Sequence, residues 1–176
     1  MTDKLKYPIG EFDCPDAINS DHINSWIERI KALPEKMESA ILQLNDVQLD
    51  TVYRPGGWTL RQVVHHVADS HMNSYIRFKL AITEDTPTIR GYFEDRWAEL
   101  PEAKNGDPGI SISLLKALHE RWSATLIAMN SSDFDKSFYH PEMDREVPLK
   151  EAVGLYAWHS DHHLAHITET RKKHGW

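Results

Sequence analysis

Four long segments of the chain place apolar residues three or four positions apart, which is the spacing of one buried helix face. These segments cover residues 20–44, 59–83, 111–129 and 149–173. A chain of 176 residues is long enough to bury one sizeable core. The pattern predicts an all-α fold in a single domain, residues 1–176, built as a four-helix bundle with long crossover loops.

Local signals refine this prediction at several points. Pro34 interrupts the first segment and predicts a kink or a division into two short helices. Thr59 and Gln62 form a capping box at the start of the second segment. A short helix is expected over residues 94–100, and a hairpin with its turn at residues 142–145.

Composition and charge exclude several classes of protein. The formal net charge is −7 and no block of basic residues occurs, which argues against binding to nucleic acid. Cys14 is the single cysteine, so no internal disulfide can form, and we expect a half-buried apolar role rather than a catalytic thiol. Residues 1–6 lack the apolar core of a signal peptide, and no run is long enough to span a membrane. The sequence therefore predicts a cytoplasmic protein without a membrane partner.

Four of the eleven histidines fall within eight residues of the fourth helical segment. His159 and His163 are four residues apart and share its apolar face, with His166 one turn further and His162 at the edge. Asp161 points the opposite way, toward solvent. A buried imidazole needs a partner for each nitrogen, and a metal ion bound by His159 and His163 would supply one.

A third ligand is needed, and the second helical segment offers three histidines. His66 lies beside the apolar stripe, His71 lies on it, and His65 lies on the more exposed side. Three polar residues continue the line of His66: Ser70, Asn73 and Arg77. Helix geometry alone leaves the choice between His66 and His71 open.

Two common metal motifs are absent. Ser160 follows His159, so there is no His-Glu-x-x-His sequence and no zincin-type glutamate base. No glutamate stands three residues before any histidine, which excludes the Glu-x-x-His motif of di-iron bundles. What remains is a histidine-rich site for one ion, suited to zinc, nickel, copper or iron.

Longer strings around these histidines are more specific than any spacing. They read Gly57-Trp58-Thr59, Gln62-Val63-Val64, His66-Val67-Ala68-Asp69-Ser70 and His159-x-x-x-His163. Together they resemble the DinB/YfiT-like family, and most closely its YfiT-type metal-dependent hydrolases. The resemblance covers almost the whole chain, from Tyr7 to Trp176.

The resemblance implies a four-helix bundle, a homodimer, and one divalent ion per subunit, zinc or nickel. Carried over by position, the three ligands are His66, His159 and His163. Asp161 stands where relatives can carry another histidine, and it is not a ligand.

Three functions are compatible with such a site. The first is a hydrolase in which the ion lowers the pKa of water toward roughly 7 for attack on a small-molecule substrate. The second, suggested by other family members, is a transferase that moves a low-molecular-weight thiol of the bacillithiol type. The third is a non-catalytic metal-binding module. Closed structural sites usually have four protein ligands, often including cysteine, and the single cysteine here is far from the histidines in the sequence, which argues against this function.

No catalytic residue is assigned by the sequence. Arg77 and Asn73 are candidates to orient a substrate. His166 is a candidate hydrogen-bond donor to a metal ligand or a proton shuttle, with ordinary packing as its alternative. No chemical role is expected for His119.

Overall fold

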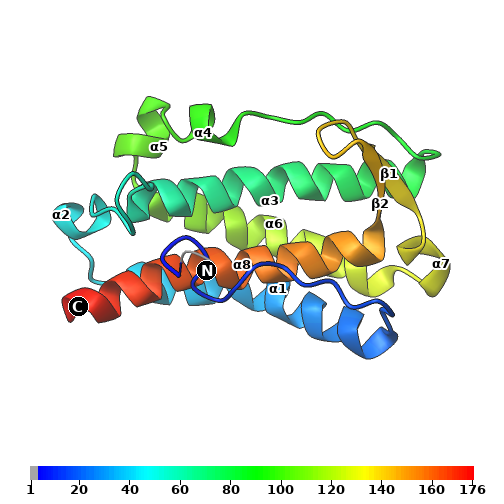
Figure 1. Cartoon of the computed structure of the whole chain (residues 1–176), viewed down its shortest axis with the longest axis horizontal. Coiled ribbons are helices and arrows are strands. Elements are labelled where there is room, and N and C mark those ends of the chain that lie inside the picture. The colour runs from blue at the N-terminus through cyan, green and yellow to red at the C-terminus, as the bar shows by residue number, and fades with distance from the viewer. Residues whose placement is uncertain (1–3) are drawn as a thin grey trace.

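Four long helices form the body of the protein in the computed structural model, which describes residues 4–176 (Figure 1). They are α1 (Ser20–Ile41), α3 (Leu60–Thr83), α6 (Pro108–Ala128) and α8 (Leu149–His174). The first and last of them run in one direction along the bundle, and the middle two run in the opposite direction. Helix α1 packs against α8 and α6, and α3 packs against the same two helices. The predicted all-α bundle is confirmed.

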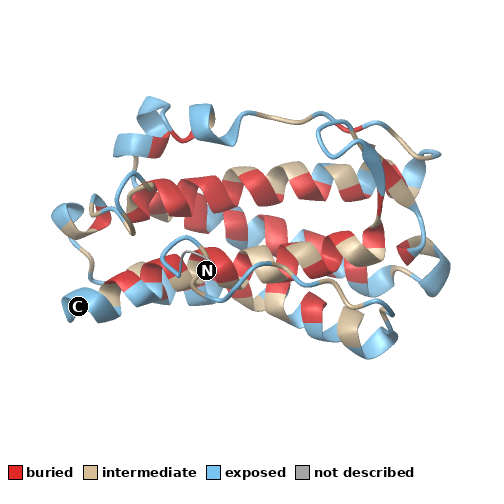
Figure 2. Ribbon diagram, viewed as in Figure 1, coloured by how far each residue is buried: buried red, intermediate tan, exposed pale blue. Residues whose placement is uncertain are grey.

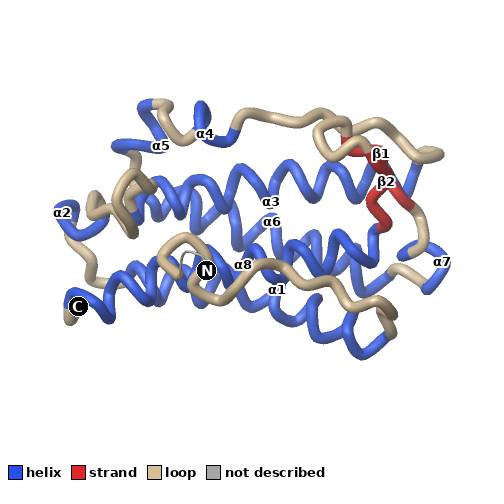
Figure 3. The backbone as a smooth tube through the Cα atoms, viewed as in Figure 1, coloured by secondary structure: helices blue, strands red, loops and turns tan. Residues whose placement is uncertain are grey.

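Short elements occupy the connections, as Figure 3 shows. They are α2 (Asp46–Leu49), α4 (Glu94–Trp97), α5 (Pro101–Asn105), α7 (Ser131–Phe134), β1 (Ser137–His140) and β2 (Arg145–Pro148). The expected short helix at 94–100 is confirmed in a shorter form. Helices α2, α5 and α7 were not expected, because single turns carry too few residues to show a periodicity.

The ends of the long helices follow their capping residues. The Thr59 hydroxyl accepts from the Gln62 amide at 3.1 Å and the Gln62 side chain accepts from the Thr59 amide at 2.9 Å, so the capping box is confirmed. Helix α6 begins three residues earlier than expected, because Asp107 caps it and Pro108 fits the first turn. Pro34 lies inside a continuous α1, so the division into two helices is wrong.

The hairpin fastens the long connection between α3 and α6. Strands β1 and β2 pair antiparallel, with Phe138 opposite Val147 and both side chains buried. The Ile89 amide donates to the Tyr139 carbonyl, and the Tyr139 amide donates to the Pro87 carbonyl, each at 3.0 Å. The segment before α4 is thereby held along the outside of α3 (Figure 1).

The core divides into two apolar clusters with polar side chains between them. A hairpin-side cluster includes Trp26, Ile30, Phe78, Trp122 and Leu149, whereas an α2-side cluster includes Leu33, Met37, Leu60, Leu115 and Ile167. Five histidines lie between the clusters on α3, α6 and α8, and we call them the histidine layer: His66, His71, His119, His159 and His163. Figure 2 shows buried residues continuing through this level of the bundle.

Residues 1–3 lie outside the described residues. The expectation about a signal peptide concerned residues 1–6, so the structure covers only residues 4–6 of that segment. Among residues 4–176, no helix combines the length and apolarity that crossing a bilayer requires.

Candidate metal centre

Three histidines from two helices converge in the middle of the bundle. His66 comes from α3, and His159 and His163 come from successive turns of α8. One ring nitrogen of each lies within 4.8 Å of the others. The ring centroids are 4.8 Å apart for His66 and His163, and 4.4 Å apart for His159 and His163. The structure thus brings together the three residues expected from the resemblance.

Burial keeps these three rings neutral. It lowers the pKa of His66 to about 4 and the pKa values of His159 and His163 well below the ordinary value, and neighbouring histidines lower them further. A histidine must be unprotonated to bind a metal ion. Three neutral nitrogens without a carboxylate among them fit one borderline divalent ion bound by imidazoles.

A cavity of about 340 Å³ opens onto the three histidines. Trp58 and Trp158 form aromatic parts of its wall, and Trp58 lies over His66 with ring centroids 4.5 Å apart. Arg77, Glu94 and Glu142 add charges of both signs. A small molecule with polar groups would fit a space of this size and lining.

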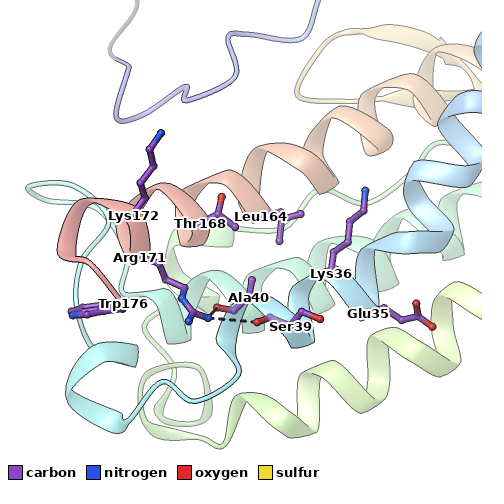
Figure 4. Close-up of a pocket in the computed structure, with 9 residues that line it drawn as sticks. All are labelled: Glu35, Lys36, Ser39, Ala40, Leu164, Thr168, Arg171, Lys172 and Trp176. Carbon is purple, nitrogen blue, oxygen red and sulfur yellow. Dashed lines mark hydrogen bonds between the residues drawn. The ribbon is translucent and has the colours of Figure 1, made fainter.

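A larger hollow of about 720 Å³ lies elsewhere, between α1 and the C-terminal half of α8 (Figure 4). Arg171 crosses it and donates to the Ala40 carbonyl at 2.7 Å. Its lining among the described residues contains no histidine or cysteine. The smaller cavity is therefore the better candidate site, because three residues that could hold an ion line it.

The other candidates from the sequence fall in different places. Arg77 lines the smaller cavity, and its guanidinium donates to the Arg90 carbonyl at 3.4 Å. Asn73 is not among the described residues that line this cavity, and its side-chain amide donates to the Asp69 carbonyl of its own helix at 2.9 Å. His166 lies behind His163, with 3.4 Å between their Nδ1 atoms.

Two expectations about exposure are wrong. His65 is buried, because α5 and the start of α6 cover it and its Nδ1 lies 2.8 Å from the Ser111 hydroxyl. Asp161 is only about 31% exposed and pairs with Arg29 of α1 at 2.7 Å. Both partners lie far away in the sequence, so helix periodicity could not reveal them.

His71 does not join the group of three. It is fully buried, and its Nε2 lies 3.0 Å from Nδ1 of His159. Its Nδ1 lies 2.9 Å from Nε2 of His119, whose Nδ1 lies 2.7 Å from the Ile30 carbonyl. Sequence reasoning missed His119, which is 48 residues from His71 and shows no pattern of its own.

The model of the DinB superfamily matches residues 29–167. The chain belongs to the DinB superfamily. It is 51% identical over 172 residues to "Putative metal-dependent hydrolase YfiT" of Bacillus subtilis (strain 168), covering 98% of this chain and 97% of that protein. A "Putative metal-dependent hydrolase" of Bacillus cereus (strain 03BB102) is 52% identical over 172 residues, covering 98% of both chains.

A solved structure of YfiT from Bacillus subtilis has the same fold. It matches with a TM-score of 0.96 and 50% sequence identity, covering 98% of this chain and 99% of that one. It is described as a four-helix bundle of unusual topology. Membership in the family and the bundle architecture, both predicted from sequence, are therefore confirmed.

Proposed function

We propose that this chain is a metal-dependent hydrolase of a small molecule, with one zinc or nickel ion held by His66, His159 and His163. The observation that carries the proposal is the convergence of three neutral imidazoles on the wall of a cavity of about 340 Å³. The names of relatives about half identical to this chain over almost its full length agree with it.

An ion held by these three neutral histidines would supply a Lewis acid able to lower the pKa of water toward roughly 7. The chain's own residues would do the rest. Trp58 and Trp158 exclude bulk water from one side of the cavity. Arg77 would orient a polar or anionic group of the substrate.

His162 is a further polar group of this cavity. Its side chain is buried, it stacks on Trp158 with ring centroids 4.4 Å apart, and its Nδ1 has no hydrogen-bond partner among the described residues. A buried nitrogen without a protein partner is costly and is commonly satisfied by an ordered water molecule. We propose that the ring of His162 forms part of the cavity wall beside Trp158.

The test is turnover of ester, amide and lactam substrates by protein purified without a histidine tag, stripped of metal and reloaded with zinc or nickel. We expect hydrolysis only in the reloaded protein and its loss in His66→Ala. The control is His174→Ala, since His174 is exposed near the end of α8. Metal-dependent transfer of bacillithiol to a model electrophile without hydrolysis would replace the proposal with thiol transfer.

The cytoplasmic location predicted from the sequence stays a prediction. The homodimer implied by the family resemblance also stays a prediction. Gel filtration combined with light scattering measures the mass of the particle against the 20.4 kDa of one chain.

A further inference from the structure

We infer that two hydrogen-bonded chains of histidines, each ending on a backbone carbonyl, hold His159 and His163 in the tautomer whose free lone pair is on Nε2. The inference rests on the proposed metal site and deepens it, since it assigns positioning roles to His71, His119 and His166. It does not depend on which reaction the site performs.

The inner chain runs from α1 to the metal centre through α6 and α3. A backbone carbonyl only accepts hydrogen bonds, so the 2.7 Å contact with the Ile30 oxygen places the proton of His119 on Nδ1. The Nε2 of a neutral His119 then accepts, and His71 donates to it from Nδ1 across 2.9 Å. The Nε2 of His71 in turn accepts from Nδ1 of His159 across 3.0 Å.

This proton count requires that His71 and His119 be neutral, and their surroundings ensure it. His71 is 0% exposed and His119 is 1% exposed. Trp122 presents its ring at steep angles to both, with centroids 5.8 Å away in each case. Burial lowers the pKa of His119 to about 4. Each ring therefore carries one proton, and only one arrangement of those protons satisfies all three contacts.

The outer chain reaches His163 from the N-terminal segment. The Nε2 of His166 lies 3.1 Å from the Lys6 carbonyl, so its proton is on Nε2. Its Nδ1 is then an acceptor for the Nδ1–H of His163 at 3.4 Å. Tyr53 stacks on His166 with ring centroids 3.9 Å apart and holds its plane. The contact with His163 is longer than those of the inner chain, so we expect it to be weaker.

The outer chain also explains a second cluster in the same region. One nitrogen each of His162, His163 and His166 lies within 4.8 Å of the others, which resembles another ion site. Both nitrogens of His166 are already engaged, by the Lys6 carbonyl and by His163. With its proton on Nδ1, His163 has its lone pair on Nε2, the nitrogen left for the first site. The cluster is therefore a support for one ion, and one ion per chain is expected.

Fixing the tautomer matters because a ligand must present its lone pair at the right place before the ion arrives. The second ring nitrogen of a metal-binding histidine is usually held by a carboxylate or carbonyl, and loss of that partner costs about 10–100-fold in metal affinity. Here other histidines are the partners, and the carbonyls stand one or two rings further away.

The direct test is long-range proton–nitrogen NMR of the metal-free protein with nitrogen-15-labelled histidine near neutral pH. We expect His71, His119, His159 and His163 in the Nδ1–H form and His166 in the Nε2–H form. His159 or His163 in the Nε2–H form would overturn the inference. The spectrum is recorded without metal or substrate, so failure of the proposed hydrolase function would leave this result unaffected.

Variants of His119 test whether the inner chain acts through an acceptor or through packing alone. His119→Phe keeps an aromatic ring but removes the acceptor, and we expect zinc affinity to fall about 10–100-fold. His119→Gln can place its carbonyl oxygen near the position of Nε2, so it should restore most of the affinity. Equal losses in both variants would contradict the inference.

A packing control and the outer chain complete the experiment. Leu60→Ala destabilises the α2-side cluster at a position eleven residues before His71 on α3, and it should leave zinc affinity nearly unchanged. His166→Leu should weaken zinc binding less than His119→Phe does. His166→Asn keeps an acceptor near the position of Nδ1, so it should weaken zinc binding less than His166→Leu does. Two zinc ions per wild-type chain would show that the second cluster binds metal and would overturn its role as a support.

Discussion

The histidine layer and the apolar clusters on either side of it are stabilised in opposite ways. In the clusters, side chains such as Phe78 and Leu60 are 0% exposed and gain stability from burial in any well-packed orientation. In the layer, His71 and His119 are equally buried but depend on hydrogen bonds of one direction and length. The clusters therefore hold the bundle together, whereas the layer places lone pairs at a fixed point within it.

The largest effect is expected from damage to an apolar cluster. Phe78→Ala removes a ring packed against Trp122 and should lower the free energy of unfolding by about 3–5 kcal/mol. Phe78 lies twelve residues from His66 on α3, about 18 Å along the helix. Trp122 links Phe78 to His71 and His119, so zinc affinity should fall somewhat, but by less than the roughly 10–100-fold expected for His119→Phe. Urea unfolding measures the free energy of unfolding, and a zinc titration measures the affinity. A loss of zinc affinity as large as that expected for His119→Phe would show that the apolar clusters and the histidine layer do not act independently.

Acid should destabilise the layer specifically. The folded pKa of His119 is about 4, below the ordinary 6.5, because burial disfavours the charged ring. The unfolded state therefore binds the extra proton first, and stability present above pH 6.5 is lost as the pH falls toward 4. For His119 this loss is roughly 3 kcal/mol at 1.36 kcal/mol for each pKa unit.

Unfolding of metal-free protein at several pH values measures that loss, with His119→Gln as the comparison. The variant lacks the titrating ring and should show a shallower dependence on pH. Identical slopes would mean that His119 is not held neutral in the folded protein.

Metal should strengthen the layer by an amount of similar size. An ion present at about 100 times its dissociation constant adds about 2.7 kcal/mol to the free energy of unfolding when it binds only the folded state. We expect this gain for wild type and for His174→Ala, and its absence in His66→Ala. A gain retained in His66→Ala, measured by the melting temperature with and without zinc, would remove His66 from the ligand set.

The smallest effect is expected outside both regions. Lys116 and Glu38 form an ion pair at 2.7 Å, with side chains 46% and 50% exposed. A double-mutant cycle with Lys116→Ala and Glu38→Ala should give a coupling of less than about 1 kcal/mol. Zinc affinity should not change in any of these variants. A coupling as large as the effect of Phe78→Ala would show that stability is not concentrated in the core clusters.

Several parts of the fold were readable from sequence because their causes are local. The capping box of Thr59 and Gln62 needs only residues three apart, and the pairing of His159 with His163 needs only one helical turn. The hairpin followed from short strands on either side of a turn. For His66, local geometry stopped at a choice with His71, and the family resemblance selected the residue that the structure places beside the other two.

What the chain determines by itself is which side chains share a helix face, since a spacing of 3.6 residues is a property of the backbone alone. Only the tertiary structure decides which faces meet. It places His119 against His71, and it supplies two carbonyls, of Ile30 and Lys6, that every residue carries and no sequence pattern distinguishes. The ligands of the proposed site can be recognised in the sequence. Of the contacts that orient them, only that between His163 and His166 is local, and the others join residues 48 to 160 positions apart.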